Sequence, residues 1–137
     1  MKDLATKVYA EATAEVSNVN TAVAVGSGSL DVFGTPCMIA LMEKATVNAI
    51  ASFLENDETT VGTKIDVSHC KASGVGAVIT AKAELREANG RKLVFDVIAY
   101  DFSDHALSCN SYEELDLLGV LLDVYTVFEG EEELFSV

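Results

Sequence analysis

The clearest hydrophobic pattern in the chain lies between residues 36 and 54. Apolar positions recur there at three- and four-residue spacing, the period of an amphipathic helix, and they are Met38, Leu41, Met42, Ala45, Ala49 and Phe53. Thr35 followed by Pro36 is typical of a helix start, because a threonine hydroxyl can cap a free backbone N–H and proline gives up a donor that has no partner. We therefore predict a helix from Pro36 to about Leu54, roughly five turns or about 28 Å long.

Alternating apolar and polar residues predict four strands around this helix. They cover residues 7–17, Thr59 to Ala72, Ala77 to Glu87 and Leu93 to Phe102. The first stretch is rich in alanine and also fits a helix, but its alternation favours a strand. Asn89 and Gly90 predict a type I′ hairpin turn, in which both central residues have positive φ. The strand from Leu93 to Phe102 is apolar on both faces, which indicates a central position in the sheet.

One long helix followed by long antiparallel strands predicts an α+β fold. The helix would bury its apolar face against the concave side of a curved antiparallel sheet. With 137 residues and no linker or repeat, the chain is expected to form a single domain over residues 1–137.

The residues after Phe102 leave two alternatives open. Ser111 to Glu114 has the pattern of a capping box and predicts a helix, whose apolar stripe would be Leu115, Leu118, Leu122 and Tyr125. Leu117 to Phe128 is also β-prone, which favours an edge strand instead. We interpret Glu129 to Glu133 as a solvated acidic tail and His105 as a surface residue.

The charge balance excludes one large class of function. Nine Lys and Arg stand against 22 Asp and Glu, a net charge of -13, so nucleic acid is not expected as a partner. The start of the chain has no apolar signal core and no run of 18 apolar residues occurs, so we expect a cytoplasmic protein without a membrane partner. The cysteines, Cys37, Cys70 and Cys109, are widely spaced and odd in number, which indicates neither a disulfide framework nor a metal site.

Three polar residues are candidates for chemistry, and each has a plainer interpretation. Thr35 stands at a helix N-terminus, where an oxyanion can bind, but it also fits an ordinary N-cap. Glu43 lies within the apolar stretch of the helix, where a carboxylate is usually paired or employed, but it also fits a solvated residue beside Lys44. His69 falls on the inward face of its predicted strand, where a lone histidine is more often a satisfied core residue than a catalyst.

Taken together, three blocks of sequence resemble a known family. These blocks are Val32 to Ala45, Thr60 to His69 and Asn89 to Phe95. In order and spacing they resemble the hotdog-fold thioesterases of the fluoroacetyl-CoA thioesterase type. Residues 1–103 match the family pattern, and residues 104–137 form a divergent C-terminal segment.

The resemblance implies a site and an activity. By motif position it implies that Thr35, Glu43 and His69 are catalytic, and that the substrate lies near Phe33, Gly34, Gly62 and Thr63. It implies hydrolysis of a small or medium acyl-CoA thioester, with no metal or redox cofactor. It also implies a homodimer or higher homo-oligomer, because hotdog proteins bind acyl-CoA at the interface of paired sheets.

Two points remain open at the level of sequence. Thr35 and Glu43 are eight residues apart on one helix, or about 12 Å, so either His69 or the substrate spans the gap, or the site mixes residues from two subunits. The family's closing Gly-x-Gly-x-His-x-Arg-like segment is missing, and no Lys or Arg follows Lys92. This departure favours an alternative function, a non-catalytic hotdog module that binds acyl-CoA or a related acyl ligand.

Overall fold

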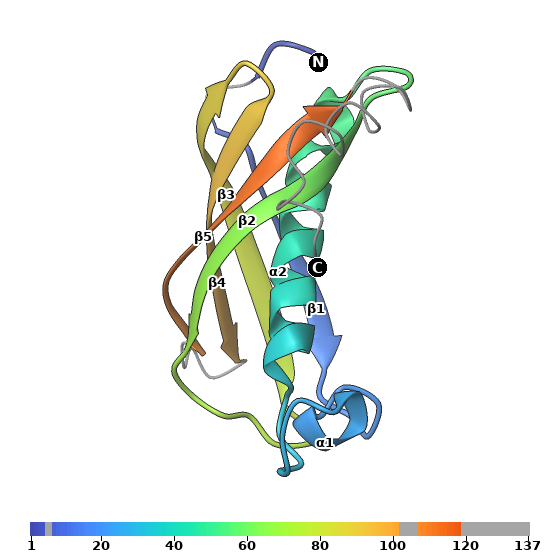
Figure 1. Ribbon diagram of the computed structural model, residues 1–137, viewed down its shortest axis with the longest axis vertical. Coiled ribbons are helices and arrows are strands. Elements are labelled where there is room, and N and C mark those ends of the chain that lie inside the picture. Colours follow the sequence, from blue (N-terminus) through green and yellow to red (C-terminus); the bar gives the residue numbers. More distant parts are fainter. Residues whose placement is uncertain (5–6, 102–106, 119–137) are drawn as a thin grey trace.

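A single antiparallel sheet and one long helix form the body of the protein in the computed structural model (Figure 1). The structure describes residues 1–4, 7–101 and 107–118. The strands are β1 (Tyr9–Glu15), β2 (Thr59–His69), β3 (Val78–Asn89), β4 (Lys92–Asp101) and β5 (Ser108–Leu118), and the helices are α1 (Ala22–Val25), α2 (Thr35–Ile50) and the short 3₁₀ helix η1 (Ala51–Phe53). The predicted α+β architecture is therefore confirmed.

The order of the strands in the sheet is β1-β3-β4-β5-β2, and all neighbours are antiparallel. The central position predicted for β4 is correct, since two strands lie on one side of it and two on the other. Strand β2 comes directly after the helix in the chain but lies at an edge, paired only with β5. Strand β5, which begins at Ser108, therefore joins the edge strand β2 to the rest of the sheet.

The core lies between α2 and the sheet, as Figure 1 shows from the way the helix runs along the sheet. The helix contributes Met38, Leu41, Met42, Ala45, Ala49 and Ile50, nearly the set that its three- and four-residue spacing predicts. The sheet contributes Ile79, Ala81, Ala83, Leu93, Phe95, Val97, Ala99 and Leu115. Small alanines on β3 and β4 let the helix approach the sheet closely, which holds the residues of α2 in a fixed position relative to β2 and β5.

The helix begins and ends differently from the prediction. Gly34, not Thr35, is the N-cap residue of α2, and no side chain caps the first turn. The hydroxyl of Thr35 is engaged elsewhere, as described below. The α-helix ends at Ile50, and the last residues of the predicted helix form η1.

The prediction for the turn between β3 and β4 is also wrong. The central residues of the hairpin between β3 and β4 are Gly90 and Arg91, because Asn89 pairs with Lys92. Only Gly90, at φ 62, has positive φ, so the turn places glycine at the first central position as type II′ does, instead of forming the type I′ turn.

The alternatives for the C-terminal region are also decided in part. Residues Ser108–Leu118 form the interior strand β5, so the predicted helix is wrong for the residues from Ser111 to Leu118. The rest of both alternatives, from residue 119 on, lies outside the described residues. His105 and the acidic stretch 129–133 lie outside the described residues. Within the described residues no helix is long and apolar enough to cross a membrane.

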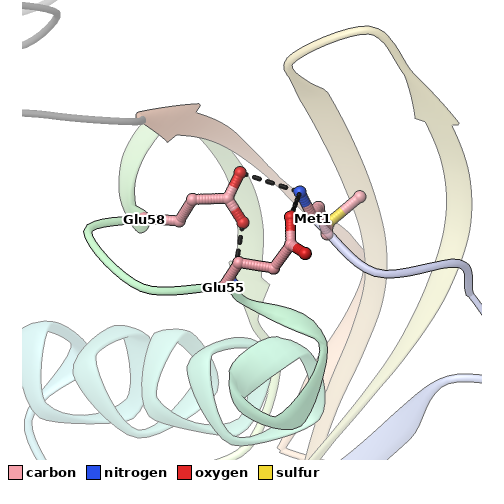
Figure 2. A network of polar contacts seen from close by, with 3 residues as sticks. All are labelled: Met1, Glu55 and Glu58. Carbon is pink, nitrogen blue, oxygen red and sulfur yellow. Dashed lines mark hydrogen bonds and ion pairs between the residues drawn. The ribbon is translucent and has the colours of Figure 1, made fainter.

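The amino group of Met1 ties the start of the chain to the turn between η1 and β2 (Figure 2). It lies 2.8 Å from a carboxylate oxygen of Glu58 and 3.1 Å from one of Glu55. The hydrogen bond to Glu58 raises the pKa of the amino group, and the same bond lowers the pKa of the Glu58 carboxyl. This network fixes the beginning of β2, the strand that carries Gly62 and His69.

Candidate active site

Thr35 and His69 meet where α2 begins and β2 ends. The Thr35 hydroxyl oxygen lies 2.7 Å from Nδ1 of His69, although the residues are 34 positions apart in the chain. Because Gly34 takes the N-cap position, Thr35 is the first helical residue and its side chain is free to face β2. The ordinary N-cap interpretation of Thr35 is thus wrong.

The imidazole of His69 has one ring nitrogen bound and one available. Its Nε2 is buried and has no hydrogen-bond partner among the described residues. A threonine oxygen can both donate and accept, so the contact fits either tautomer. When Nδ1–H donates to Thr35, Nε2 carries the lone pair that a general base requires.

A cavity of about 240 Å³ opens beside this pair. Its lining includes Phe33, Thr35, His69 and Lys71. Phe33 is buried and its backbone N–H donates to the carbonyl of Ser73, so the wall next to Thr35 is fixed by the loop after β2. The cavity therefore brings an apolar ring, a hydroxyl, an imidazole and a cation together.

Glu43 lies in a different cavity, of about 120 Å³. This second cavity is lined by Ile39, Glu43, Gly62, Lys64, Ile65 and Glu113. Glu43 is half-buried, so neither the fully solvated interpretation nor a fully buried carboxylate applies. Within one chain the structure brings Thr35 and His69 together and leaves Glu43 in a separate cavity.

Gly62 is the point of closest approach between β2 and Glu43. A Cβ atom built on Gly62 would lie 2.1 Å from Oε2 of Glu43, far inside van der Waals contact. A side chain at this position would therefore displace the carboxylate. Only glycine allows Glu43 to lie against β2 in this way.

Gly34 and Thr63, the other two residues predicted to lie near the substrate, contact neighbouring parts of the fold. Gly34 is buried against α1, where an added Cβ would lie 3.1 Å from Cγ2 of Val25. The hydroxyl of Thr63 donates to the backbone carbonyl of Glu114 at 3.3 Å, next to an irregularity in the pairing of β2 with β5. Neither residue lines one of the two cavities described above.

Glu113 is the site residue that sequence reasoning missed. It is 1% exposed, and burial, with a smaller contribution from the nearby Glu43, raises the pKa of its carboxyl to about 9. The capping-box interpretation concealed it, because that pattern places Glu113 on a helix. A period of two, which puts Glu113 on the same face as the buried Leu115, is the signal that could have shown it to face inward.

The cysteines differ from one another in state. Cys70, next to His69, is disulfide-bonded, whereas Cys37 is a free thiol on α2. The expectation that the sequence contains no disulfide is therefore wrong. The described residues contain no group of three or more His, Cys, Asp or Glu side chains that could hold a metal ion.

A long helix packed on a five-stranded antiparallel sheet is the architecture of the hotdog fold, and here a threonine–histidine pair lies at the N-terminus of that helix. A model of the family described as fluoroacetyl-CoA-specific thioesterase matches residues 16–108. The chain belongs to this family.

Individual relatives agree with this assignment. The fluoroacetyl-CoA thioesterase of Streptantibioticus cattleyicolor is 45% identical over 74 residues, 54% of this chain and 53% of that protein. The matched part thus spans about half the length of this curated relative.

Solved structures of the same family superimpose on nearly the whole chain. A phenylalanine-to-alanine variant of the fluoroacetyl-CoA-specific thioesterase FlK has a TM-score of 0.81 at 29% identity, covering 94% of this chain and 99% of that one. The complex of such a variant with fluoroacetate and CoA has a TM-score of 0.74 at 31% identity, covering 85% and 96%.

Proposed function

We propose that this protein hydrolyses a small or medium acyl-CoA thioester. The observation that carries the proposal is the 2.7 Å contact between Thr35 and His69, which leaves a buried Nε2 without a partner beside a cavity. Its membership of the thioesterase family supports the same reaction. The solved relative that holds fluoroacetate and CoA supports acyl-CoA as the class of substrate.

The three candidate residues supply the groups that thioester hydrolysis needs. Glu43 either attacks the thioester carbonyl carbon directly or takes a proton from an attacking water. In the water route, the carbon–sulfur bond breaks and the proton that the water gave up passes by way of Glu43 and His69 to the departing CoA thiolate. After direct attack by Glu43, the thiolate leaves and an acyl–Glu43 anhydride forms; water then hydrolyses this anhydride while His69 takes the water's proton and passes it to the thiolate. Thr35 orients His69, and backbone N–H groups at the start of α2 stabilise the developing oxyanion. Because these groups suffice, the proposal includes no metal or redox cofactor.

Four residues in or beside the two cavities would contact the substrate. Phe33 would pack against the acyl group or the pantetheine arm, and Gly62 would let the thioester approach Glu43. Gly34 and Thr63 would act through the backbone, Gly34 at the N-terminus of α2 and Thr63 beside Gly62.

The separation of Glu43 from His69 supports a homodimer. We propose that each working site combines the Thr35–His69 pair of one subunit with Glu43 of a second copy, since the two groups line different cavities within one chain. Light scattering tests this, and a monomer that turns over substrate would contradict it. The cytoplasmic location remains part of the proposal, and cell fractionation tests it.

Hydrolysis of an acyl-CoA panel, from acetyl to long chain, tests the activity. Free CoA should be detected by chromatography, because the free thiol of Cys37 would react with thiol reagents. We expect turnover by the parent, loss of turnover in Glu43→Ala and His69→Ala, and full turnover in the matched surface variant Lys44→Ala. A folded parent that binds acyl-CoA without hydrolysing any chain length would overturn the enzyme and favour the binding module.

A further inference from the structure

Glu113 places a carboxyl group in the core, on the strand next to the Glu43 cavity. In the sheet it lies opposite Phe95 of β4 on one side and Ile65 of β2 on the other. Phe95 is fully buried and Ile65 lines the cavity, so the strands that flank Glu113 offer it no charge at these positions. Burying a carboxyl group in such surroundings lowers the stability of the fold unless another group forms a hydrogen bond with it.

Glu43 of α2 is that partner, and the two carboxyls converge over Gly62. The position of a Gly62 Cβ would be 2.1 Å from Oε2 of Glu43 and 3.6 Å from Oε1 of Glu113. Hydrogen bonding with Glu43 is, after burial, the second cause that raises the pKa of the Glu113 carboxyl. The other oxygen of Glu113, Oε2, is buried without a partner.

The direction of this hydrogen bond follows from burial. Two carboxylates in contact repel each other, so one of them must hold a proton. Burial raises the pKa of Glu113 to about 9, whereas Glu43 is half-buried and opens into the cavity. Glu113 is therefore the donor at neutral pH and Glu43 the acceptor.

The charged groups nearby do not replace Glu43 as the partner. Lys64 of β2 lines the same cavity, but its Nζ lies 4.0 Å from a carboxylate oxygen of Glu114. On β4, Lys92 forms an ion pair with Glu114 at 2.6 Å, and Asp96 forms one with Arg86. On β5, Tyr112 has its ring beside Lys64 and Arg86.

We propose that Glu113 is a positioning residue for hydrolysis, whose neutral carboxyl donates a hydrogen bond that holds the Glu43 carboxylate over Gly62 and toward the substrate. This inference rests on the catalytic role proposed for Glu43. It assigns a function to β5, the strand that departs from the family's sequence pattern.

Three variants test the positioning role by kinetics. Glu113→Leu removes the donor and should lower kcat at least tenfold while KM changes less than twofold. Glu113→Gln keeps a neutral donor of the same shape and should retain most of kcat. The matched control is Glu15→Gln, at an exposed glutamate of β1 that lines neither cavity, which should behave as the parent. Unchanged kcat in Glu113→Leu, or equal losses in folded Glu113→Leu and Glu113→Gln, would overturn the proposal.

The pH profile separates positioning from packing. In the parent, ionisation of Glu113 sets two carboxylates against each other, so kcat should fall as the pH rises through about 9. Glu113→Gln cannot ionise and should lose this alkaline limb, while Glu15→Gln should keep it. An alkaline limb that persists in active Glu113→Gln would overturn the proposal.

A measurement without turnover distinguishes failure of this inference from failure of the proposed activity. Carboxyl-carbon NMR of the parent labelled in glutamate should show one signal that titrates far above the ordinary glutamate range and disappears in Glu113→Gln. The Glu43 signal should shift in the same step. An inactive parent with this coupled titration would refute only the thioesterase, whereas a Glu113 signal with an ordinary titration would refute the hydrogen-bonded pair.

Discussion

The hydroxyl of Thr35 and Nδ1 of His69 lie 2.7 Å apart, across the junction between the first turn of α2 and the last residue of β2. This contact uses the threonine side chain that would otherwise cap the helix. It also leaves Nε2 of His69 buried, unpartnered and next to a cavity. The orientation of the imidazole thus depends on one hydroxyl group.

Replacing that hydroxyl should lower the rate of hydrolysis. Thr35→Val keeps the shape of the side chain and removes the hydrogen bond, which is worth about 1–3 kcal/mol, so kcat should fall roughly 10- to 100-fold. Thr35→Ser retains the hydroxyl and should stay within a few-fold of the parent. Steady-state kinetics on the best substrate of the panel measures both, and equal activity of the valine variant and the parent would show that the contact does not orient His69.

Filling the space at Gly62 should disable Glu43 without unfolding the protein. In Gly62→Ala the added Cβ would meet Oε2 of Glu43 at 2.1 Å, but this atom ends a flexible side chain, so the carboxylate moves and the backbone stays. We expect kcat to fall about 100-fold, since a misplacement of about 1 Å can cost that much. The melting temperature should change little.

The matched glycine control is Gly74→Ala. An added Cβ at Gly74 meets nothing within 4 Å, and its backbone does not have positive φ. Activity should therefore be unchanged, and stability should rise by up to about 1 kcal/mol because the unfolded chain loses freedom. Equal activity losses in Gly62→Ala and Gly74→Ala would point to a general effect of removing glycine instead of displacement of Glu43.

Lys71 should contribute to binding the anionic CoA. It lines the cavity that holds His69, and its Nζ lies 3.9 Å from a carboxylate oxygen of Asp101. In a chain of net charge -13, a cation at this position offsets repulsion of the CoA phosphates. Lys71→Gln should raise KM roughly 3- to 10-fold with little change in kcat, and high salt should shrink the difference.

Lys44→Gln is the control for Lys71, because Lys44 is exposed on α2 and lines neither cavity. Its KM should equal that of the parent at every salt concentration. A KM in Lys71→Gln that is unchanged at low salt would contradict a role in binding CoA.

Glu113 should make the stability of the fold depend on pH. Its carboxyl has a pKa of about 9 when folded and an ordinary value of 4.5, so the folded state holds the extra proton between these pH values. Stability from this group is therefore full below pH 4.5 and is lost as the pH rises toward 9, with a slope of up to about 1.4 kcal/mol per pH unit.

Chemical denaturation of the parent and of Glu113→Gln between pH 5 and about 9 measures this effect. The free energy of unfolding of the parent, relative to the glutamine variant, should decrease steadily with pH. Glu15→Gln, which changes an exposed residue at the end of β1, should follow the parent. A constant difference between parent and Glu113→Gln would show that Glu113 titrates normally.

Local periodicity in the amino-acid sequence is enough to predict the elements whose hydrophobic pattern lies within one segment. The buried set of α2, from Met38 to Ala49, and the strands β1 to β4 follow from spacings within single segments. The family motifs also singled out Thr35, Glu43 and His69, although they left open which of these residues meet.

The features that depend on contacts between distant segments can be seen only in the folded chain. Insertion of β5 between β4 and β2 turned Glu113 from a surface position of a predicted helix into a buried partner of Glu43. The contact with His69 likewise moved the N-cap from Thr35 to Gly34. Both outcomes depend on contacts between α2 and strands that are distant in the sequence. These contacts override local helix signals because a buried polar group needs a hydrogen-bond partner.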